Sequence, residues 1–281
     1  MVENKIPLNE KIIGISTDGV GYGDDGNVWG GEILICSYNE YKRLGHLQYQ
    51  PMIGGDRCSK FPARMLASIL LNTLEIKEAQ KIFKKLKLNE GLEYGKIELN
   101  AVISQFEKKS TGEKIPYSSS TGRIFDVVSY LLGASQIRTY RGEPAMRLEG
   151  LAAKGDSSKI DIEINFSKKG GKYIINTSQL ILDIINLRLE NKYRREDIGA
   201  TFQKALSSIF AELAIKIASE NNIDKIGLSG GVSYNYAFSS NLKKIIEKEG
   251  FQFLEHDLVP PGDAGISVGQ IIGGFVKYEY K

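Results

Sequence analysis

The segment Asp18–Glu32 combines residue types that are typical of a binding or catalytic site. Glycine occupies positions 19, 21, 23, 26, 30 and 31, and several carboxylates and the only tryptophan of the chain lie in the same segment. Because glycine leaves the backbone unobstructed, such a segment suits tight turns and close contact with a ligand or another chain. It directly follows the apolar run Ile12–Ile15, so we expect it to lie at the end of a strand.

A second glycine-rich turn lies in the segment Lys225–Asn235. A short apolar strand is followed there by Gly230 and Gly231 and then by a predicted helix. Backbone N–H groups at a helix N-terminus point at an anion, and the helix dipole adds about 0.3–1 kcal/mol. Asn235 would then reach a ribose or a phosphate. The alternative is a plain strand-to-helix turn that binds no ligand.

Two further helix starts carry acidic side chains that suit a nucleoside. Asp126 is placed either to accept hydrogen bonds from ribose hydroxyls or to complement the dipole of its own helix. Gly142 and Glu143 begin the next predicted helix, with Pro144 near its first position. They contact a purine or ribose in one interpretation, and Glu143 is an ordinary surface acid in the other.

Asp18 and Asp263 each lie beside glycine or alanine, at the end of a strand or in a loop. If they converge, two carboxylates about 4 Å apart repel by roughly 4 kcal/mol at an effective dielectric of 20. The pair then needs a cation, an Arg or Lys, or a shared proton. Imidazole partners would suit iron or zinc. The only histidines, His46 and His256, are not at helical i, i+4 spacing, and we expect them to be structural or solvated.

These residues are carried by a predicted alternation of strands and helices. Apolar periodicity and turn signals predict strands over 11–17, 28–36, 41–47, 160–166, 172–176, 225–228 and 251–254. The same signals predict helices over 61–86, 123–132, 143–154, 177–191, 195–221, 232–248 and 264–275. This order indicates an α/β fold.

Composition narrows the function classes. The net charge of +3 is small and no basic stripe is interleaved with aromatic residues, so charge does not indicate a nucleic-acid partner. Cys36 and Cys58 are too few for a disulfide framework and lack metal-site spacing. No apolar run reaches about 18 residues and the first residues do not form a signal peptide, so we expect a cytoplasmic protein that has no membrane partner.

The order of the motifs resembles that of the C-terminal part of the hydrogenase-maturation carbamoyltransferase family (HypF). The resemblance runs from about residue 11 to the end, and its first motif is the most specific. Antibiotic O-carbamoyltransferases and tRNA threonylcarbamoyl-adenosine synthases share the Gly-Gly…Asn and terminal Asp elements, but not the Tyr22–Glu32 run. In chain order the motifs are Asp18–Glu32, Arg43–Leu47, Gly54–Asp56, Ser119–Asp126, Gly142–Glu149, Leu228–Asn235 and Val259–Gly265.

The resemblance implies an actin/sugar-kinase/Hsp70-like (ASKHA) fold, in which two α/β lobes close around a nucleotide. On this basis we expect residues 1–115 to form the remainder of an N-terminally incomplete first lobe, with the glycine-rich segment and a helical insertion. We expect residues 116–281 to form the second α/β lobe, with the nucleotide-binding segments.

The resemblance also implies a reaction. A carbamoyl-adenylate, made from ATP and carbamoyl phosphate by a separate upstream domain, arrives at this module. Its carbamoyl group then passes to the C-terminal cysteine of a partner maturation protein (HypE), and the product becomes the cyanide ligand of a nickel–iron hydrogenase. The matching positions imply catalytic and metal-binding roles for Asp18 and Asp263, and nucleotide binding by Asp126, Gly142, Glu143, Gly230, Gly231 and Asn235.

The sequence departs from the family pattern in its metal site. It contains no His-x-x-x-His motif, no upstream domains and no counterpart of the start of the first lobe. A divalent iron or zinc site of Asp18 and Asp263 is therefore incomplete without the missing histidines. We expect a C-terminal fragment or a split or degenerate paralogue. Three hypotheses follow: a module for carbamoyl transfer to a cysteine, a carbamoyltransferase that acts on a small-molecule hydroxyl, and a non-catalytic nucleotide-binding paralogue.

Overall fold

The computed structural model of the chain describes residues 1–108 and 114–279. Residues 109–113, near the end of the predicted first lobe, and residues 280–281, at the end of the predicted second lobe, lie outside the described residues. None of the helices in the described ranges combines the length and the apolar character needed to cross a membrane.

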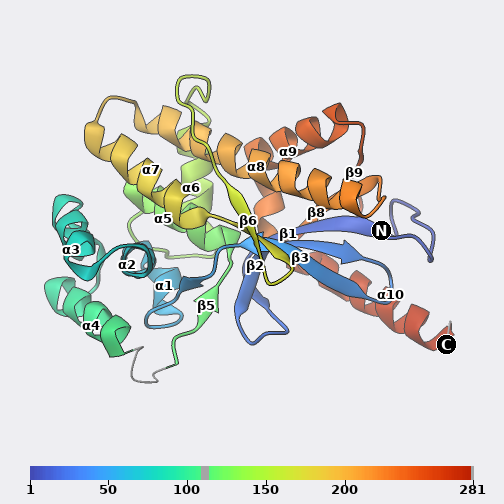
Figure 1. Cartoon of the computed structure of the whole chain (residues 1–281), viewed down its shortest axis with the longest axis horizontal. Coiled ribbons are helices and arrows are strands. Elements are labelled where there is room, and N and C mark those ends of the chain that lie inside the picture. The colour runs from blue at the N-terminus through green and yellow to red at the C-terminus, as the bar shows by residue number, and fades with distance from the viewer. Residues whose placement is uncertain (109–113, 280–281) are drawn as a thin grey trace.

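A mixed β-sheet forms the centre of the described chain, in the order β6-β7-β3-β2-β1-β8-β9, with β4 and β5 attached beside β2 (Figure 1). Its strands are β1 (Ile12–Tyr22), β2 (Val28–Cys36), β3 (Tyr41–Leu47), β4 (Gln50–Pro51), β5 (Tyr117–Ser118), β6 (Phe166–Lys169), β7 (Lys172–Ile175), β8 (Lys225–Ser229) and β9 (Gln252–Leu254). β1 pairs antiparallel with β2 and parallel with β8. The first strands are therefore adjacent to strands that come some 200 residues later.

The irregular pairing of β1 shapes the site. In the apolar first half of β1, successive side chains point to opposite faces of the sheet, and Ile13 and Ile15 are buried in the core. Regular pairing with β2 is interrupted between Thr17 and Gly21, so Asp18–Val20 bulge out of the ladder. After the bulge, β1 continues to Tyr22, within the glycine-rich segment, so it is longer than the predicted strand 11–17.

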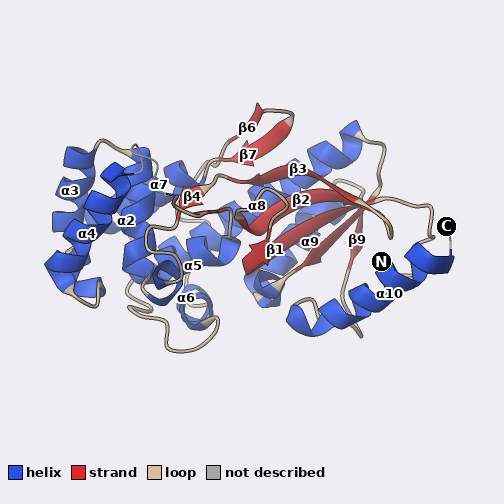
Figure 2. Ribbon diagram, turned by 90° about the horizontal axis from the view of Figure 1, so that it is seen from below, coloured by secondary structure: helices blue, strands red, loops and turns tan. Residues whose placement is uncertain are grey.

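Helices cover the sheet and extend beyond one of its ends. They are α1 (Arg57–Lys60), α2 (Pro62–Thr73), α3 (Ile76–Lys85), η1 (Leu88–Gly91), α4 (Gly95–Lys108), α5 (Thr121–Leu131), α6 (Glu143–Ala152), α7 (Thr177–Glu190), α8 (Arg195–Glu220), η3 (Gly231–Tyr234), α9 (Tyr236–Lys248), η4 (Asp263–Gly265) and α10 (Ile266–Glu279). Figures 1 and 2 show α1–α4 grouped at one end, α7–α9 along one face of the sheet, and α10 on the opposite side.

Aromatic side chains join α5 to the long helix α8 and to α9. Phe125 makes edge-to-face contacts with Phe202 and Phe238, with ring centroids 5.0 and 6.1 Å apart. Phe210 meets Phe238 in the same way at 6.0 Å. Such contacts add about 0.5–1.5 kcal/mol each beyond the area they bury. The start of α5, which carries Arg123 and Asp126, is thereby fixed to the core.

Most predicted elements are confirmed, and three differences stand out. The predicted helix 61–86 is two helices, because Leu74 adopts an extended conformation between α2 and α3. Helix α4 was not predicted. The predicted strand 160–166 was wrong over residues 160–165, which have no sheet partner, although their burial alternates. The sheet also takes strands from both sides of the predicted boundary at residue 115, and the division into two lobes stays a prediction.

Candidate functional site

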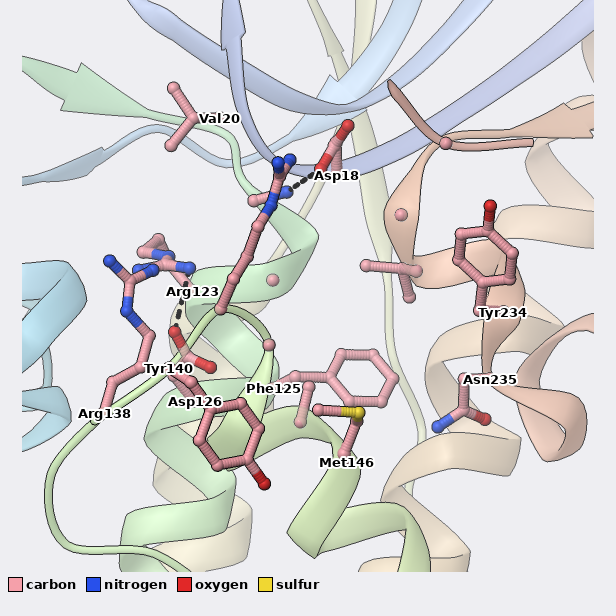
Figure 3. A pocket seen from close by; sticks show the side chains of 18 of the residues that line it. Asp18, Val20, Arg123, Phe125, Asp126, Arg138, Tyr140, Met146, Tyr234 and Asn235 are labelled. Atoms are coloured by element: carbon pink, nitrogen blue, oxygen red, sulfur yellow. Dashed lines mark hydrogen bonds and ion pairs between the residues drawn. The ribbon is translucent and has the colours of Figure 1, made fainter. Parts of the chain in front are cut away.

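A cavity of about 1210 Å³ lies between β1, the starts of α5 and α6, and the turn that follows β8 (Figure 3). Of the sequence-predicted site residues, six line it: Asp18, Asp126, Gly142, Gly231, Asn235 and Asp263. Gly230 and Glu143 do not belong to the lining. The structure therefore brings together most of the residues that the sequence places far apart.

Asp18 lies at the bulge of β1, beside the turn after β8. Its carboxylate Oδ1 accepts a hydrogen bond of 2.6 Å from the backbone N–H of Gly19. A Cβ atom on Gly231 would lie 3.2 Å from the same oxygen, so the glycine lets the turn approach Asp18 closely. This proximity follows from the parallel pairing of β1 with β8, which places Ser16 opposite Ser229.

Gly230 does not line the cavity, and the packing of the backbone explains why this position is glycine. Its φ of +102° favours glycine, and any Cβ there would meet the carbonyl oxygen of Thr17. Its backbone N–H donates to the carbonyl oxygen of Pro261 at 2.8 Å, and the Ser229 hydroxyl donates to the same oxygen at 3.0 Å. The turn thus holds the loop that leads to Asp263, and the Gly230 N–H is already engaged.

Asn235 is both a helix cap and a lining residue. Its side-chain Oδ1 accepts a hydrogen bond of 2.9 Å from the backbone N–H of Phe238, which caps α9. Figure 3 shows its amide nitrogen directed toward the cavity. The carboxylate of Glu149 on α6 accepts from the backbone N–H of Tyr236 at 2.9 Å, so α6 and α9 are joined beside Asn235.

Asp263 is paired with a cation that the sequence argument did not identify. Arg141 Nη1 lies 2.6 Å from Asp263 Oδ2, and this hydrogen bond lowers the pKa of Asp263. The charge of Asp18 also raises the pKa of Arg141, after the stronger effect of Asp263. Arg141 therefore supplies the positive charge that two acids in one cavity require. Its position in the loop after α5 carried no motif that would have revealed it.

Glu143 positions the loop that carries Arg141. Its carboxylate accepts hydrogen bonds from the Thr139 backbone N–H at 2.6 Å and from the Thr139 hydroxyl at 2.7 Å. It also pairs with Arg147 Nε at 2.9 Å. Gly142 begins α6 with a φ of +78°, which directs the chain from the loop into the helix.

Asp126 and Arg123 form a buried ion pair beside the cavity. Arg123 Nη2 lies 3.0 Å from Asp126 Oδ2, and only 5% and 2% of the two residues is exposed. Burial raises the pKa of Asp126 and lowers that of Arg123. Figure 3 shows the Arg138 guanidinium next to that of Arg123. Sequence reasoning identified Asp126 but neither arginine.

The opposite part of the lining is apolar. Phe125, Ala145, Met146, Val232 and the ring of Tyr234 contribute to it, and Met146 and Tyr234 are well exposed to the cavity and solvent. A purine ring is flat and weakly polar, so this part suits a nucleobase, whereas the arginines suit its anionic groups. A site with both properties fits a nucleotide.

The Tyr22–Glu32 part of the glycine-rich segment supports the site from outside the cavity. Trp29 Nε1 and the Tyr49 hydroxyl donate to the Asp25 carboxylate at 2.9 and 2.6 Å. Burial alone would raise the pKa of Asp25, but these hydrogen bonds hold it at about 2. Arg43 lies 4.1 Å above the Trp29 ring and pairs with buried Glu32 at 3.0 Å. These side chains fix the hairpin from which Asp18 projects.

The acids of this cavity do not by themselves fit a metal ion. Within residues 1–108 and 114–279, no group of three or more His, Cys, Asp or Glu side chains is arranged to hold one. Asp263 is already paired with Arg141, while His46 contacts the Leu47 carbonyl oxygen and His256 contacts that of Val259. The iron or zinc site therefore stays a prediction.

Comparison with known proteins agrees with this geometry. Residues 14–270 match the family described as "Carbamoyltransferase, Kae1-like Domain, second subdomain". The chain is 39% identical over 268 residues to the "Probable carbamoyltransferase HypF" of Methanocaldococcus jannaschii, covering 95% of this chain and 33% of that protein.

Two solved structures have the same fold. The crystal structure of "T.kodakarensis HypF" superposes with a TM-score of 0.85 at 37% identity, over 96% of this chain and 34% of that one. A full-length HypF "in the phosphate- and nucleotide-bound form" superposes with a TM-score of 0.84 at 31% identity, over 97% of this chain and 34% of that one. The α/β, ASKHA-like fold expected from the sequence is confirmed.

Proposed function

Because this chain belongs to the HypF family of carbamoyltransferases, we propose that its cavity holds carbamoyl-adenylate and passes the carbamoyl group to a cysteine. The acceptor in this proposal is the C-terminal cysteine of a hydrogenase-maturation partner (HypE), for synthesis of the cyanide ligand of nickel–iron hydrogenase. The chain spans 33% of the M. jannaschii relative, and we assign formation of the carbamoyl-adenylate to another domain. A cytoplasmic location stays a prediction.

The observation that carries the proposal is the composition of the cavity. An apolar side formed by Phe125 and Met146 faces a side that carries Arg123 and Arg138, and Arg141 also lines the cavity. This combination suits the base and the phosphate of an adenylate. The nucleotide-bound form of a HypF with a TM-score of 0.84 supports nucleotide binding in this chain.

The proposed step is a substitution at the carbamoyl carbon. The acceptor thiol first loses its proton to solvent, and its sulfur then bonds to the carbamoyl carbon. The bond from that carbon to the phosphate oxygen breaks, and AMP leaves with the electron pair. Positive charge from Arg123, Arg138 and Arg141 stabilises negative charge on the carbonyl oxygen and on the departing phosphate. Asp18 and Asp263 orient the carbamoyl group and the arginines.

The test is a transfer assay with this chain, ATP, carbamoyl phosphate and a protein that supplies the adenylate-forming domain. Acceptor peptides that end in cysteine or in serine are followed by mass spectrometry. We expect carbamoylation of the cysteine peptide alone. Asn235→Ala and Asp263→Ala should each slow it at least about tenfold, the scale of one lost polar contact in a transition state. Asp161→Ala, an exposed acid outside this cavity, serves as the control.

Each other outcome contradicts a stated part of the proposal. Unchanged transfer in both site variants would place the reaction elsewhere. Equal carbamoylation of the serine peptide would favour a small-molecule hydroxyl acceptor. Nucleotide binding with no turnover, even with the adenylate supplied, would favour the non-catalytic paralogue.

A further inference from the structure

A stretch of extended chain runs directly before the edge strand of the sheet and has no strand beside it. Residues 160–165 lead into β6, which lies at one end of the strand order. Where this stretch meets β6, the Asn176 N–H donates to the Asn165 carbonyl oxygen at 2.9 Å. We call residues 160–164 the open segment, because within residues 1–108 and 114–279 their backbone N–H and C=O groups have no hydrogen-bond partner.

The open segment is accessible to another chain. Asp161 and Glu163 are exposed, whereas Ile162 and Ile164 are half-buried and pack against the core. The backbone is thus held extended by one of its sides, and its polar groups are left to solvent. An incoming strand would replace those contacts with water by backbone hydrogen bonds, which is how a sheet edge accepts an additional strand.

The neighbouring strand β6 is protected from such pairing, but the open segment is not. β6 carries Lys168 and Lys169, and lysine side chains on an edge strand oppose the approach of another strand. The open segment contains no lysine, proline or glycine. The edge therefore admits a strand before β6, over about 16 Å of extended chain.

A groove of about 440 Å³, which we call the α8 groove, lies between residues 160–165 and helix α8. Helix α8 lines it with residues that recur every three or four positions, namely Thr201, Lys204, Ala205, Ser208, Ile209 and Glu212. Because this spacing places them on one face of the helix, that face follows the groove for about 16 Å. The helical wall is therefore about as long as the open segment, and an extended chain fits along both.

The charge of the α8 groove selects its occupant. Among the described residues that line it, the carboxylates of Asp161, Glu163 and Glu212 outnumber the one cation, Lys204. In the described ranges, none of these three acids lies within ion-pair distance of a cation. Partial burial raises the pKa of Glu212, as expected for a carboxylate without a cation beside it. The groove therefore favours an occupant with Lys or Arg side chains over an acidic one.

We propose that the open segment and the α8 groove bind an extended, basic segment of a partner protein as an additional strand. The alternation along the open segment sets the side chains of that strand. Basic residues lie beside Asp161 and Glu163, and apolar residues alternate with them in register with Ile162 and Ile164. Among the described residues, the α8 groove shares none of its lining with the nucleotide cavity, so this inference is independent of the proposed function.

The test is a fluorescence anisotropy titration of the whole chain into labelled acetyl-Lys-Val-Lys-Val-Lys-Val-Lys-amide, the Lys-Val peptide. We expect saturable binding with a Kd below about 1 mM, weakened by added salt. The same residues in block order, Lys-Lys-Lys-Lys-Val-Val-Val, keep the charge but lose the alternation, and should bind at least about tenfold more weakly. A peptide with Glu in place of Lys should not bind.

Methylation of the peptide backbone separates strand pairing from simple charge attraction. Successive N–H groups of a strand point to opposite edges, so N-methyl groups at alternate residues block one edge and leave the other free. One alternately methylated Lys-Val peptide should lose binding, and the peptide methylated at the other positions should retain it. This comparison uses the wild-type chain and does not depend on the folding of a variant.

A double variant tests the acids of the open segment. Asp161→Asn combined with Glu163→Gln should weaken the Lys-Val peptide about fivefold, the scale of two exposed ion pairs. Glu249→Gln, an exposed acid outside the groove, is the control and should bind as wild type does. These side chains are exposed, so melting temperatures should not change. Amide hydrogen exchange should slow in residues 160–164 when the peptide binds, which locates the contact.

Three results would overturn strand addition at this edge. They are no binding of the Lys-Val peptide at about 1 mM, equal binding of the two methylated peptides, and an unchanged affinity in the double variant. Equal binding of the methylated peptides would mean that charge alone attracts them. These measurements involve neither nucleotide nor transfer, so failure of the transfer assay would contradict the proposed function alone.

Discussion

Arg141 and Asp263 join two loops across the cavity, with Nη1 and Oδ2 2.6 Å apart. Arg141 belongs to the loop between α5 and α6, and Asp263 begins η4 directly before α10. The pair therefore links the segment that Glu143 positions to the segment that the turn after β8 positions. The contact joins two parts of the site that are distant in sequence.

Replacing Arg141 with Gln should raise the pKa of Asp263 toward the ordinary value of 3.8, because the hydrogen bond from the guanidinium is what lowers it. Both side chains are exposed, so the urea midpoint should not change. Carboxyl-carbon NMR titration measures the shift, with Arg194→Gln, an exposed arginine outside the cavity, as the matched control. An Asp263 pKa that stays low in Arg141→Gln would show that another group lowers it.

The buried pair of Glu32 and Arg43 should be the most sensitive polar contact in the hairpin. Their side chains are only 2% and 4% exposed. Arg43→Met leaves the buried Glu32 carboxylate without its cationic partner. We expect this variant to lower the free energy of unfolding, measured with urea, by about 3–5 kcal/mol. The double variant Glu32→Gln with Arg43→Met should cost less than Arg43→Met alone. A double variant that is no more stable would contradict this explanation.

Gly230 and Gly269 form a matched pair of glycine tests. Gly230→Ala places a Cβ against the Thr17 carbonyl oxygen at a φ of +102°, and we expect it to cost more than about 2 kcal/mol. Gly269 lies in α10 with open space around its Cβ position, so Gly269→Ala should be neutral or stabilise by up to about 1 kcal/mol. Chemical unfolding compares them, and similar effects of both would refute the packing argument.

His46 should make the chain less stable in mild acid. Burial, followed by the charge of Arg43, lowers its pKa from 6.5 to about 4. The unfolded chain therefore takes up a proton that the folded chain does not, and stability falls as the pH drops from 6.5 to 4, by about 3 kcal/mol in all. His46→Gln should flatten this dependence in urea unfolding between pH 7 and 4.5. An unchanged slope would mean that His46 titrates normally when folded.

Local signals predicted the elements where turn chemistry and periodicity agree. The strand 28–36 matches the structure because the Asp24–Asn27 turn marks its start, and the strand 41–47 is confirmed as well. Burial alternates along residues 160–165, but they only rest Ile162 and Ile164 against the core without a neighbouring strand. Side-chain alternation reports an extended chain with one buried side, and it does not reveal whether another strand pairs with it.

The residues of the candidate site show the same contrast between local motifs, which the sequence reveals, and contacts between distant segments, which it does not. Asp18, Gly231 and Asn235 were recognisable because glycine turns at strand ends mark close approach of the backbone. Arg138 and Arg141 were not, because they lie in a loop without periodicity and act only through partners distant in sequence. Gly230 shows the opposite case, in which a residue with a clear motif serves the packing of β1 and the Pro261 loop.

The central claim is that a nucleotide binds in the cavity between α5, α6 and the turn after β8. Its most direct measurement is calorimetric titration of AMP into wild type, Met146→Leu and Met146→Glu. Met146 lines the apolar part and is 50% exposed, so both variants should fold as wild type does. We predict that Met146→Leu binds AMP as wild type does. In Met146→Glu the bound nucleotide would cover the new carboxylate, which weakens binding at least about tenfold. Equal AMP affinity in all three proteins would contradict the claim.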